Sequence, residues 1–76
     1  MVSACVLIRT EHGRFDDVFQ TVKKIRGVTK VFPVLGRYDV VVDIESEDFS
    51  ELASNILRLG KISGVVFTET LAEIRQ

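Results

Sequence analysis

The sequence is poor in the residues that most often carry catalysis or hold metals. Its 76 residues include one cysteine, Cys5, one histidine, His12, and no tryptophan. A single cysteine cannot form a disulfide within the chain, and the paired cysteines of zinc, haem, thioredoxin-type and copper-chaperone motifs are missing. His12 lies in a polar stretch typical of a solvated loop, and Cys5 lies in an apolar stretch typical of a small buried side chain. We therefore expect no metal, no cofactor and no enzymatic activity.

A strong charge of one sign and a long hydrophobic run are also missing. Ten Lys and Arg residues against eleven Asp and Glu residues give a net charge of -1 and a pI near 5.7. No basic field therefore attracts nucleic acid or anionic lipid. No apolar run approaches the roughly 20 residues of a membrane-spanning helix, and the first residues lack the basic segment of a signal peptide. We expect a cytoplasmic protein with no direct contact to nucleic acid or membrane.

Hydrophobic periodicity predicts six elements within a single domain that spans residues 1–76, because a chain this short supports one core. Four strands are expected at residues 2–9, 28–35, 38–44 and 65–74. Two amphipathic helices are expected, one from residue 15 to a closing Gly27 and one from about residue 48 to Gly60. The first helix has acidic residues at its start and basic residues at its end, as the helix dipole favours: Asp16, Asp17, Lys23, Lys24 and Arg26.

Local signals refine three of these elements. Pro33 has no N–H to donate, so its strand is expected at an edge of the sheet. The Gly36-Arg37 pair between two β-like runs predicts a two-residue hairpin. Asp48 and Glu51 have the spacing of a capping box, which predicts the start of the second helix.

The two halves of the chain resemble each other. Ile25-Arg26-Gly27-Val28 leads from the first helix into a strand, and Ile62-Ser63-Gly64-Val65 does so after the second. Two βαβ halves with right-handed crossovers give the ferredoxin-like βαββαβ plait, an α+β fold. Its four-stranded antiparallel sheet has the order 4-1-3-2 with both helices on one face, which places Pro33 on an edge strand.

The face of the sheet that the helices leave open is expected to be partly hydrophobic. Cys5 and Leu7 alternate with the most apolar row of the first strand, and Val41 does so on the third. An apolar second face on a small domain favours packing against another sheet. We therefore predict a homodimer formed through the sheet.

The segment from Gly36 to Asp39 carries the chemistry most suited to a small ligand. A glycine in a hairpin exposes backbone N–H groups that can meet a carboxylate, and Asp39 beside it can receive an ammonium group. One turn thus offers both halves of an amino-acid site. Residue chemistry alone favours a structural interpretation, with Gly36 as a turn residue and Asp39 at the start of a strand. The third strand offers Val41 and Asp43 where RNA-recognition motifs of the same topology place aromatic residues, which disfavours RNA binding.

Three segments together resemble the effector-binding (RAM) domain of the Lrp/AsnC transcriptional regulators. They are Ile25-Arg26-Gly27-Val28, Val34-Leu35-Gly36-Arg37-Tyr38-Asp39-Val40-Val41-Val42 and Ile62-Ser63-Gly64-Val65-Val66-Phe67-Thr68-Glu69-Thr70. The resemblance implies a βαββαβ fold, dimers formed through the sheets, further assembly such as octamers, and amino-acid effectors bound between dimers. It also implies an effector site formed by Gly36, Tyr38 and Asp39 and lined by Thr68 and Thr70, although β-propensity alone explains the threonines.

Family members usually carry an N-terminal helix-turn-helix, whereas the first predicted strand starts at residue 2 here. The chain therefore resembles the stand-alone form of the domain. We expect an oligomeric, non-enzymatic module that senses an amino acid or a related metabolite and co-assembles with a full-length Lrp/AsnC regulator. Two alternatives are a small dimeric α/β-barrel enzyme with a cavity between its sheets and an assembly adaptor with a vestigial pocket. An ACT-like regulatory domain is a related alternative that differs in how its sheets associate.

Overall fold

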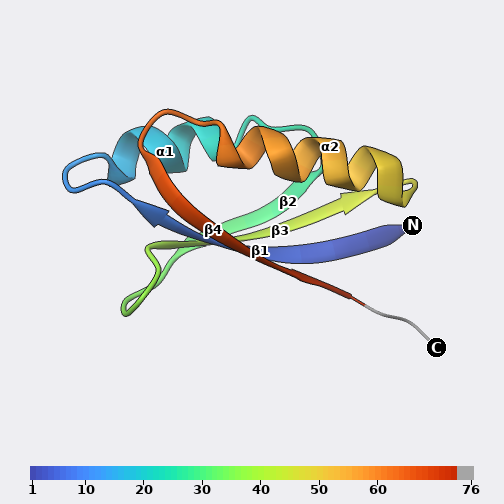
Figure 1. The fold of residues 1–76 in the computed structure, drawn as a ribbon, viewed down its shortest axis with the longest axis horizontal. Coiled ribbons are helices and arrows are strands. Elements are labelled where there is room, and N and C mark those ends of the chain that lie inside the picture. The colour runs from blue at the N-terminus through green and yellow to red at the C-terminus, as the bar shows by residue number, and fades with distance from the viewer. Residues whose placement is uncertain (74–76) are drawn as a thin grey trace.

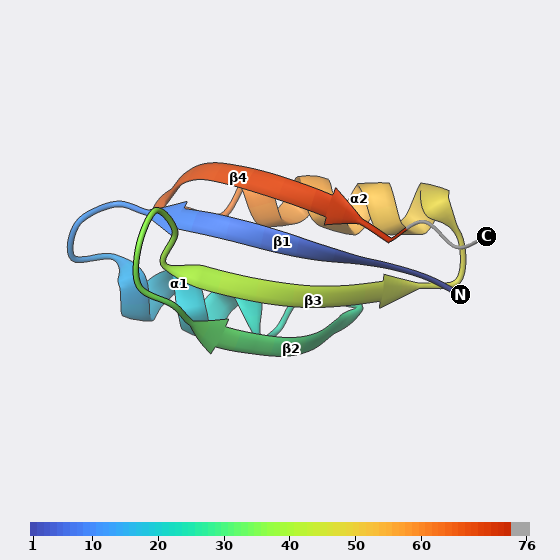
Figure 2. The same cartoon turned by 90° about the horizontal axis from the view of Figure 1, so that it is seen from below.

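The computed structural model describes residues 1–73 and has the predicted order βαββαβ (Figure 1). Both helices lie on one side of the sheet, and the view from below in Figure 2 shows the other side of the sheet uncovered. The elements are β1 (Val2–Thr10), α1 (Phe15–Val22), β2 (Val28–Pro33), β3 (Val40–Ser46), α2 (Phe49–Gly60) and β4 (Val65–Ala72). The predicted end of β4 at Ile74 lies outside the described residues.

The four strands form one antiparallel sheet in the order β2-β3-β1-β4, which is the predicted order read from the opposite edge. The central strands β1 and β3 pair along most of their length, from Val2 opposite Ser46 to Ile8 opposite Val40. β2 and β4 are the edges, and Pro33 ends edge strand β2. The prediction that Pro33 belongs to an edge strand is confirmed.

The core lies between the sheet and the two helices. Alternate residues of β1 and β3 point into it, because successive side chains of a strand point to opposite faces. Each helix adds buried apolar residues from one face, spaced four apart in α1 and seven apart in α2. The buried apolar residues of this core are Ala4, Val6, Ile8, Val18, Val22, Val40, Val42, Ile44, Leu52 and Leu59.

Helix α2 begins where its capping signal predicts. The Asp48 side chain accepts a hydrogen bond from the backbone N–H of Glu51, with an N to Oδ1 distance of 2.8 Å. This bond satisfies one of the N–H groups that the first turn of a helix leaves without an intrahelical partner. None of the helices in residues 1–73 is long and apolar enough to cross a membrane.

Helix α1 is shorter than predicted and ends at Val22 rather than near Gly27. The backbone N–H groups of Lys24 and Ile25 donate to carbonyls three residues earlier, at 3.1 and 3.0 Å, instead of four. These tighter turns lead the chain down to the sheet, where Gly27 O accepts from Glu45 N at 2.9 Å. The basic residues predicted for the last turn of the helix therefore follow it: Lys23, Lys24 and Arg26.

The two similar tetrapeptides form the same turn. Val28 N donates to Ile25 O at 3.3 Å, and Val65 N donates to Ile62 O at 3.1 Å. Gly27 and Gly64 have φ values of +91° and +97°, in the region that only glycine adopts readily. A Cβ at Gly27 would lie 2.6 Å from the carbonyl oxygen of Glu45, so the close approach to β3 also requires glycine.

The hairpin between β2 and β3 is longer than the predicted two-residue turn. Pro33 and Val40 form the last strand pair, and residues 34–39 form a loop closed by a bond from Val34 N to Asp39 O at 3.0 Å. Tyr38 and Asp39 thus belong to the loop and not to β3. Pro33 has no backbone N–H to donate, and Asp39 N donates instead to Ile8 O on β1 at 2.8 Å. The regular pairing of β2 with β3 therefore ends at Pro33 and Val40.

We call the sheet face opposite the helices the open face. It presents Cys5, Leu7 and Val41 as predicted, of which Val41 is 9% exposed and the other two are half-buried. The register adds three exposed apolar side chains to this face: Phe32, Phe67 and Leu71. The expectation of a partly hydrophobic second face is confirmed.

Candidate ligand-binding site

The loop of residues 34–39 projects beyond the sheet on the side away from the helices (Figures 1 and 2). Leu35 at its tip is fully exposed. Gly36 has a φ of +124°, and a Cβ added there would meet nothing within 4 Å. Gly36 is therefore required by the conformation of the loop and not by a close neighbour, and its backbone is accessible to a ligand.

Asp39 fastens this loop to the end of β1. Its Oδ2 accepts hydrogen bonds from the backbone N of Thr10 at 2.8 Å and from Thr10 Oγ1 at 3.2 Å. The carboxylate is partly buried at this point. Both bonds end on Oδ2, so Oδ1 is the atom that could receive a ligand ammonium group. Asp39 therefore has a structural role, as considered above, but this role is to bind the loop to β1 and not to start a strand.

Tyr38 leans onto the open face of β4. Its hydroxyl donates a short hydrogen bond to Glu69 Oε1, and its ring stacks on Phe67 with centroids 6.4 Å apart and an interplanar angle of 20°. The bond to Glu69 raises the pKa of Tyr38 above its usual value, because ionisation would remove the proton that Glu69 accepts. Glu69 thus holds the Tyr38 ring in place.

The two predicted threonines lie on the other face of the sheet. Thr68 pairs with Ile8 and Thr70 pairs with Val6, and both partners point into the core. Residues directly opposite each other in an antiparallel pair share a face, so the threonines lie on the helix side. Glu69 lies between them and points to the open face with Leu7. The structure thus places Tyr38 against β4, but on the face that Thr68 and Thr70 do not share.

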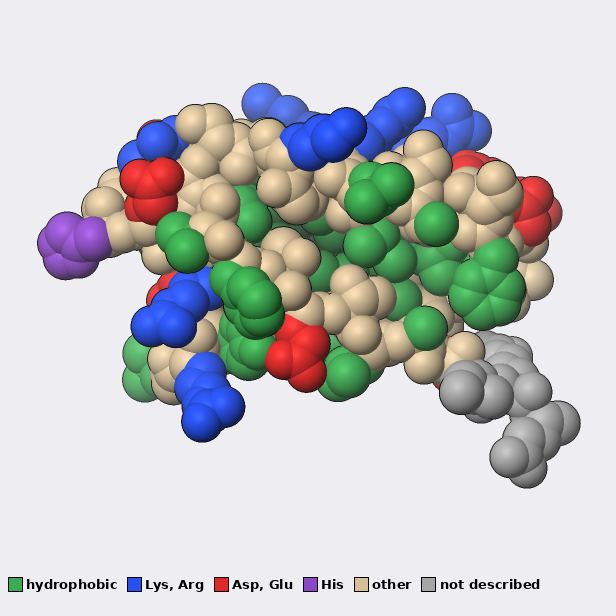
Figure 3. All heavy atoms as spheres, in the orientation of Figure 1, with side chains coloured by type: hydrophobic (Ala, Val, Ile, Leu, Met, Phe, Trp, Pro, Cys, Tyr) green, Lys and Arg blue, Asp and Glu red, His purple; other side chains and the backbone are tan. Residues whose placement is uncertain are grey.

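A hollow of about 360 Å³ lies beside Tyr38 at this end of the sheet, and it is lined by Arg9, Arg37, Tyr38 and Phe67. Figure 3 shows most basic side chains on the helix side and a smaller basic group at the lower left, beside hydrophobic and acidic side chains. The sequence patterns did not point to Arg9, Phe67 or Glu69. Phe67 and Glu69 are two residues apart on β4 and so share a face, but only the strand register shows that Arg9 shares that face with them.

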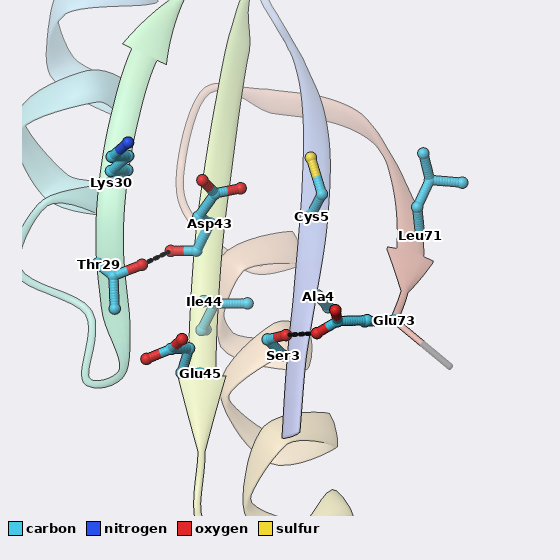
Figure 4. Close-up of a pocket in the computed structure, with 10 residues that line it drawn as sticks. All are labelled: Ser3, Ala4, Cys5, Thr29, Lys30, Asp43, Ile44, Glu45, Leu71 and Glu73. Atoms are coloured by element: carbon cyan, nitrogen blue, oxygen red, sulfur yellow. Dashed lines mark hydrogen bonds between the residues drawn. The ribbon is translucent and has the colours of Figure 1, made fainter. Parts of the chain in front are cut away.

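A second hollow, of about 390 Å³, lies on the open face at the opposite end of the strands (Figure 4). Asp43 points between Lys30 and Cys5 there, and Thr29 Oγ1 donates to the backbone oxygen of Asp43 at 3.2 Å. Desolvation raises the pKa of the Cys5 thiol, and the neighbouring Asp43 carboxylate raises it further. A thiol in this state is a poor nucleophile at neutral pH, as expected of a structural cysteine. Across residues 1–73 no cluster of His, Cys, Asp or Glu side chains could hold a metal ion.

The architecture and the loop-end site define a ferredoxin-like α+β domain whose polar loop side chains gather at one end of an uncovered sheet. The sequence model of one family, the Lrp/AsnC ligand binding domain, matches residues 3–76, so the chain belongs to that family. HTH-type transcriptional regulator FL11 of Pyrococcus abyssi is 31% identical over 72 residues, which are 95% of this chain and 48% of that protein. The chain spans about half the length of the curated relatives it matches.

Solved structures share this architecture. TTHA0845 from Thermus thermophilus is 31% identical with a TM-score of 0.92, and the alignment covers 100% of this chain and 96% of that one. The complex of the transcriptional regulator NMB0573 from Neisseria meningitidis with L-Met has a TM-score of 0.83 at 17% identity. That alignment covers 99% of this chain and 51% of the regulator. The similarity to NMB0573 shows that the two proteins share a fold.

Proposed function

We propose that this chain is an oligomeric regulatory module that binds a small-molecule effector, an amino acid, and acts on transcription through a partner regulator. The observation that carries the proposal is the match of residues 3–76 to a ligand-binding domain whose longer relatives are transcriptional regulators. A regulator of the same fold is known in complex with L-Met, which supports an amino acid as the effector class.

The effector would bind at the loop of residues 34–39. Asp39 Oδ1 would receive the ammonium group, while the accessible backbone N–H groups around Gly36 would meet the carboxylate. Tyr38 would border the site on one side of the sheet. Thr68 and Thr70 would line it only where the ligand reaches across the edge of β4, because they lie on the helix side of that strand.

Assembly would use the open face. The exposed apolar side chains Phe32 and Leu71 on this face favour burial against the open face of a second copy. Dimers would then assemble further, toward octamers, with effectors between them. The proposed partner is a longer Lrp/AsnC regulator, because the curated relatives of this chain are HTH-type transcriptional regulators of about twice its length.

Thermal unfolding of the purified chain against a panel of common amino acids tests the proposal. A ligand at 100 times its Kd stabilises the folded state by about 2.7 kcal/mol, which moves the midpoint of a domain this small by several degrees. We expect one or a few amino acids to shift the midpoint. A panel without any shift would overturn the amino-acid proposal.

The variant Asp39→Asn tests the site itself. Asparagine keeps an oxygen that can accept from Thr10 but removes the charge that an ammonium group needs. We expect this variant to stay folded and to lose most of the amino-acid affinity, whereas Asp16→Asn, an exposed neutralisation on α1, should bind as the parent does. Equal affinity of Asp39→Asn and the parent would remove Asp39 from the site.

A further inference from the structure

We infer that the hollow lined by Arg9, Arg37, Tyr38 and Phe67 binds the carboxylate of a small organic acid, with the flat apolar part of that acid against the aromatic pair. The inference rests on the proposed function, because it names the groups at the loop end that hold the ligand anion. It adds two guanidinium groups to the backbone N–H groups near Gly36 as partners of the ligand carboxylate.

The charges of the hollow favour an anion. Within the described residues the side chains of Arg9 and Arg37 form no ion pair or hydrogen bond, whereas Arg14 donates to Asp17 at 3.2 Å and Arg26 pairs with Glu51 at 3.7 Å. Both free guanidinium groups lie close enough to Tyr38 to counteract part of the rise in its pKa. A guanidinium group presents a planar set of donors that matches a carboxylate.

The charged side chains that line the hollow, Arg9 and Arg37, are both positive. Glu69 on the same face is engaged by the Tyr38 hydroxyl, so its charge lies on the Tyr38 side of the hollow. A carboxylate beside the two arginines would be attracted by both, whereas an ammonium group between them would be repelled.

The aromatic pair gives the hollow a preference for a flat apolar body. Phe67 is 54% exposed, and its ring stacks on Tyr38, whose position is held by Glu69. Aromatic faces bind other flat rings in offset or edge-to-face contact. A volume of about 360 Å³ lies in the range of small-molecule pockets, and one substituted ring is enough to occupy such a site.

The chain provides its own reporter for this site. Tyr38 is the one tyrosine in a sequence without tryptophan, so the intrinsic fluorescence of the protein comes from the proposed site. Phenylacetate is a suitable probe, because it combines one carboxylate with one flat ring. Phenethylamine keeps the ring and reverses the charge, and cyclohexylacetate keeps the charge and removes the flat ring.

We expect phenylacetate to change the Tyr38 fluorescence saturably, phenethylamine to leave it unchanged and cyclohexylacetate to bind more weakly than phenylacetate. Arg37→Gln and Arg9→Gln should each weaken phenylacetate binding about tenfold or more, as expected for the loss of a charge-assisted hydrogen bond. Arg58→Gln on α2, which removes the same charge from an exposed site on the helix side, should leave the affinity unchanged. No saturable change, or equal affinity of the two site variants and the parent, would overturn the inference.

The two proposals can fail separately. An amino acid that stabilises the parent in an Asp39-dependent way, with equal affinity for Arg37→Gln and Arg9→Gln, would support the proposed function and overturn this inference. Arginine-dependent binding of phenylacetate, with no amino acid that shifts the unfolding midpoint, would support this inference and overturn the amino-acid effector.

Discussion

At the scale of single residues, one loop shows how side chains far apart in sequence come to act together. Tyr38 and Asp39 are neighbours in the chain, yet Tyr38 reaches Glu69 on β4 while Asp39 reaches Thr10 on β1. The two side chains thus fasten the loop to two strands. Gly36 lies between these two residues and the exposed Leu35, and its backbone stays accessible. A ligand at this loop would meet a conformation that is already held in place, which reduces the entropy lost on binding.

The ionisation of Tyr38 provides a first prediction. The hydrogen bond to Glu69, with smaller contributions from desolvation and the Glu69 charge, raises its pKa above the ordinary value of a tyrosine. The near-ultraviolet absorbance of tyrosinate, which reports on Tyr38 alone, should therefore rise at a higher pH than in a short peptide. The stabilising effect of this bond is complete below the pKa of an unfolded tyrosine and is lost as the pH rises through the higher folded value.

The matched variant for this titration is Glu69→Gln, which removes the charged acceptor. Its midpoint should return toward that of free tyrosine, while Glu11→Gln, an exposed change in the loop after β1, should titrate as the parent does. A Tyr38 midpoint that is the same in the parent and in Glu69→Gln would show that the bond is not formed in solution.

At the scale of elements, the two helices differ in how their ends are held. α2 has Asp48 as a capping side chain, whereas the residue before α1, Arg14, makes no capping bond and instead donates to Asp17 and to Ser63 Oγ. α1 is also the shorter helix, with 8 residues against 12. Helix α1 therefore depends more on its packing against the sheet, through Val18 and Val22, than on local stabilisation.

Removal of the α2 cap provides the second prediction. Asp48→Ala should lower the free energy of unfolding by about 1 kcal/mol, because the backbone N–H of Glu51 loses its acceptor. Asp48→Asn keeps an acceptor oxygen and should stay close to the parent, and Glu47→Ala tests the loss of a neighbouring charge alone. Urea unfolding at one fixed protein concentration measures all three, and equal stability of Asp48→Ala and Asp48→Asn would contradict the capping role.

At the scale of the whole molecule, the fold leaves one of its two sheet faces uncovered. A four-stranded sheet needs both faces covered when both are apolar, and two short helices cover one. Phe32, Phe67 and Leu71 remain exposed on the open face of a chain of 8.5 kDa. We expect an identical open face to cover Phe32 and Leu71, because a two-fold axis buries both apolar surfaces at once.

A charge on the open face provides the third prediction. Leu71→Lys should dissociate the assembly, because a charged side chain would replace an apolar one in the buried contact between the two faces. Leu57→Lys is the matched control, since Leu57 is 65% exposed on α2 and Leu71 is 54% exposed on the open face. Sedimentation velocity should show the parent and Leu57→Lys as dimers or larger and Leu71→Lys as a monomer. A parent chain that sediments as a folded 8.5 kDa species at low concentration would contradict assembly through this face.

The element order and the core were predictable because they depend on local periodicity and on glycine. Alternation in β1 and β3 and the helical spacing of Val18, Val22, Leu52 and Leu59 identify the buried face of each element from residue spacing alone. Gly27 and Gly64 mark two equivalent turns, because their positive φ values are a property of the residue type. Pro33 likewise predicts an edge strand, since it has no N–H to donate.

The length of α1, the size of the loop and the neighbours of the site depended on tertiary contacts. α1 ends early because Gly27 must reach Glu45 on β3, and the hairpin opens to six residues because Asp39 is bound to β1. The residues near Gly27 and Asp39 in the sequence do not indicate that these partners lie on β3 and β1. The register alone decides that Glu69 and Phe67 face Tyr38 while Thr68 and Thr70 lie on the helix side, since a shift of one residue exchanges the two faces of a strand. The sequence by itself therefore determined which elements form and which faces are apolar, and the pairing of the strands decided which side chains meet at the loop.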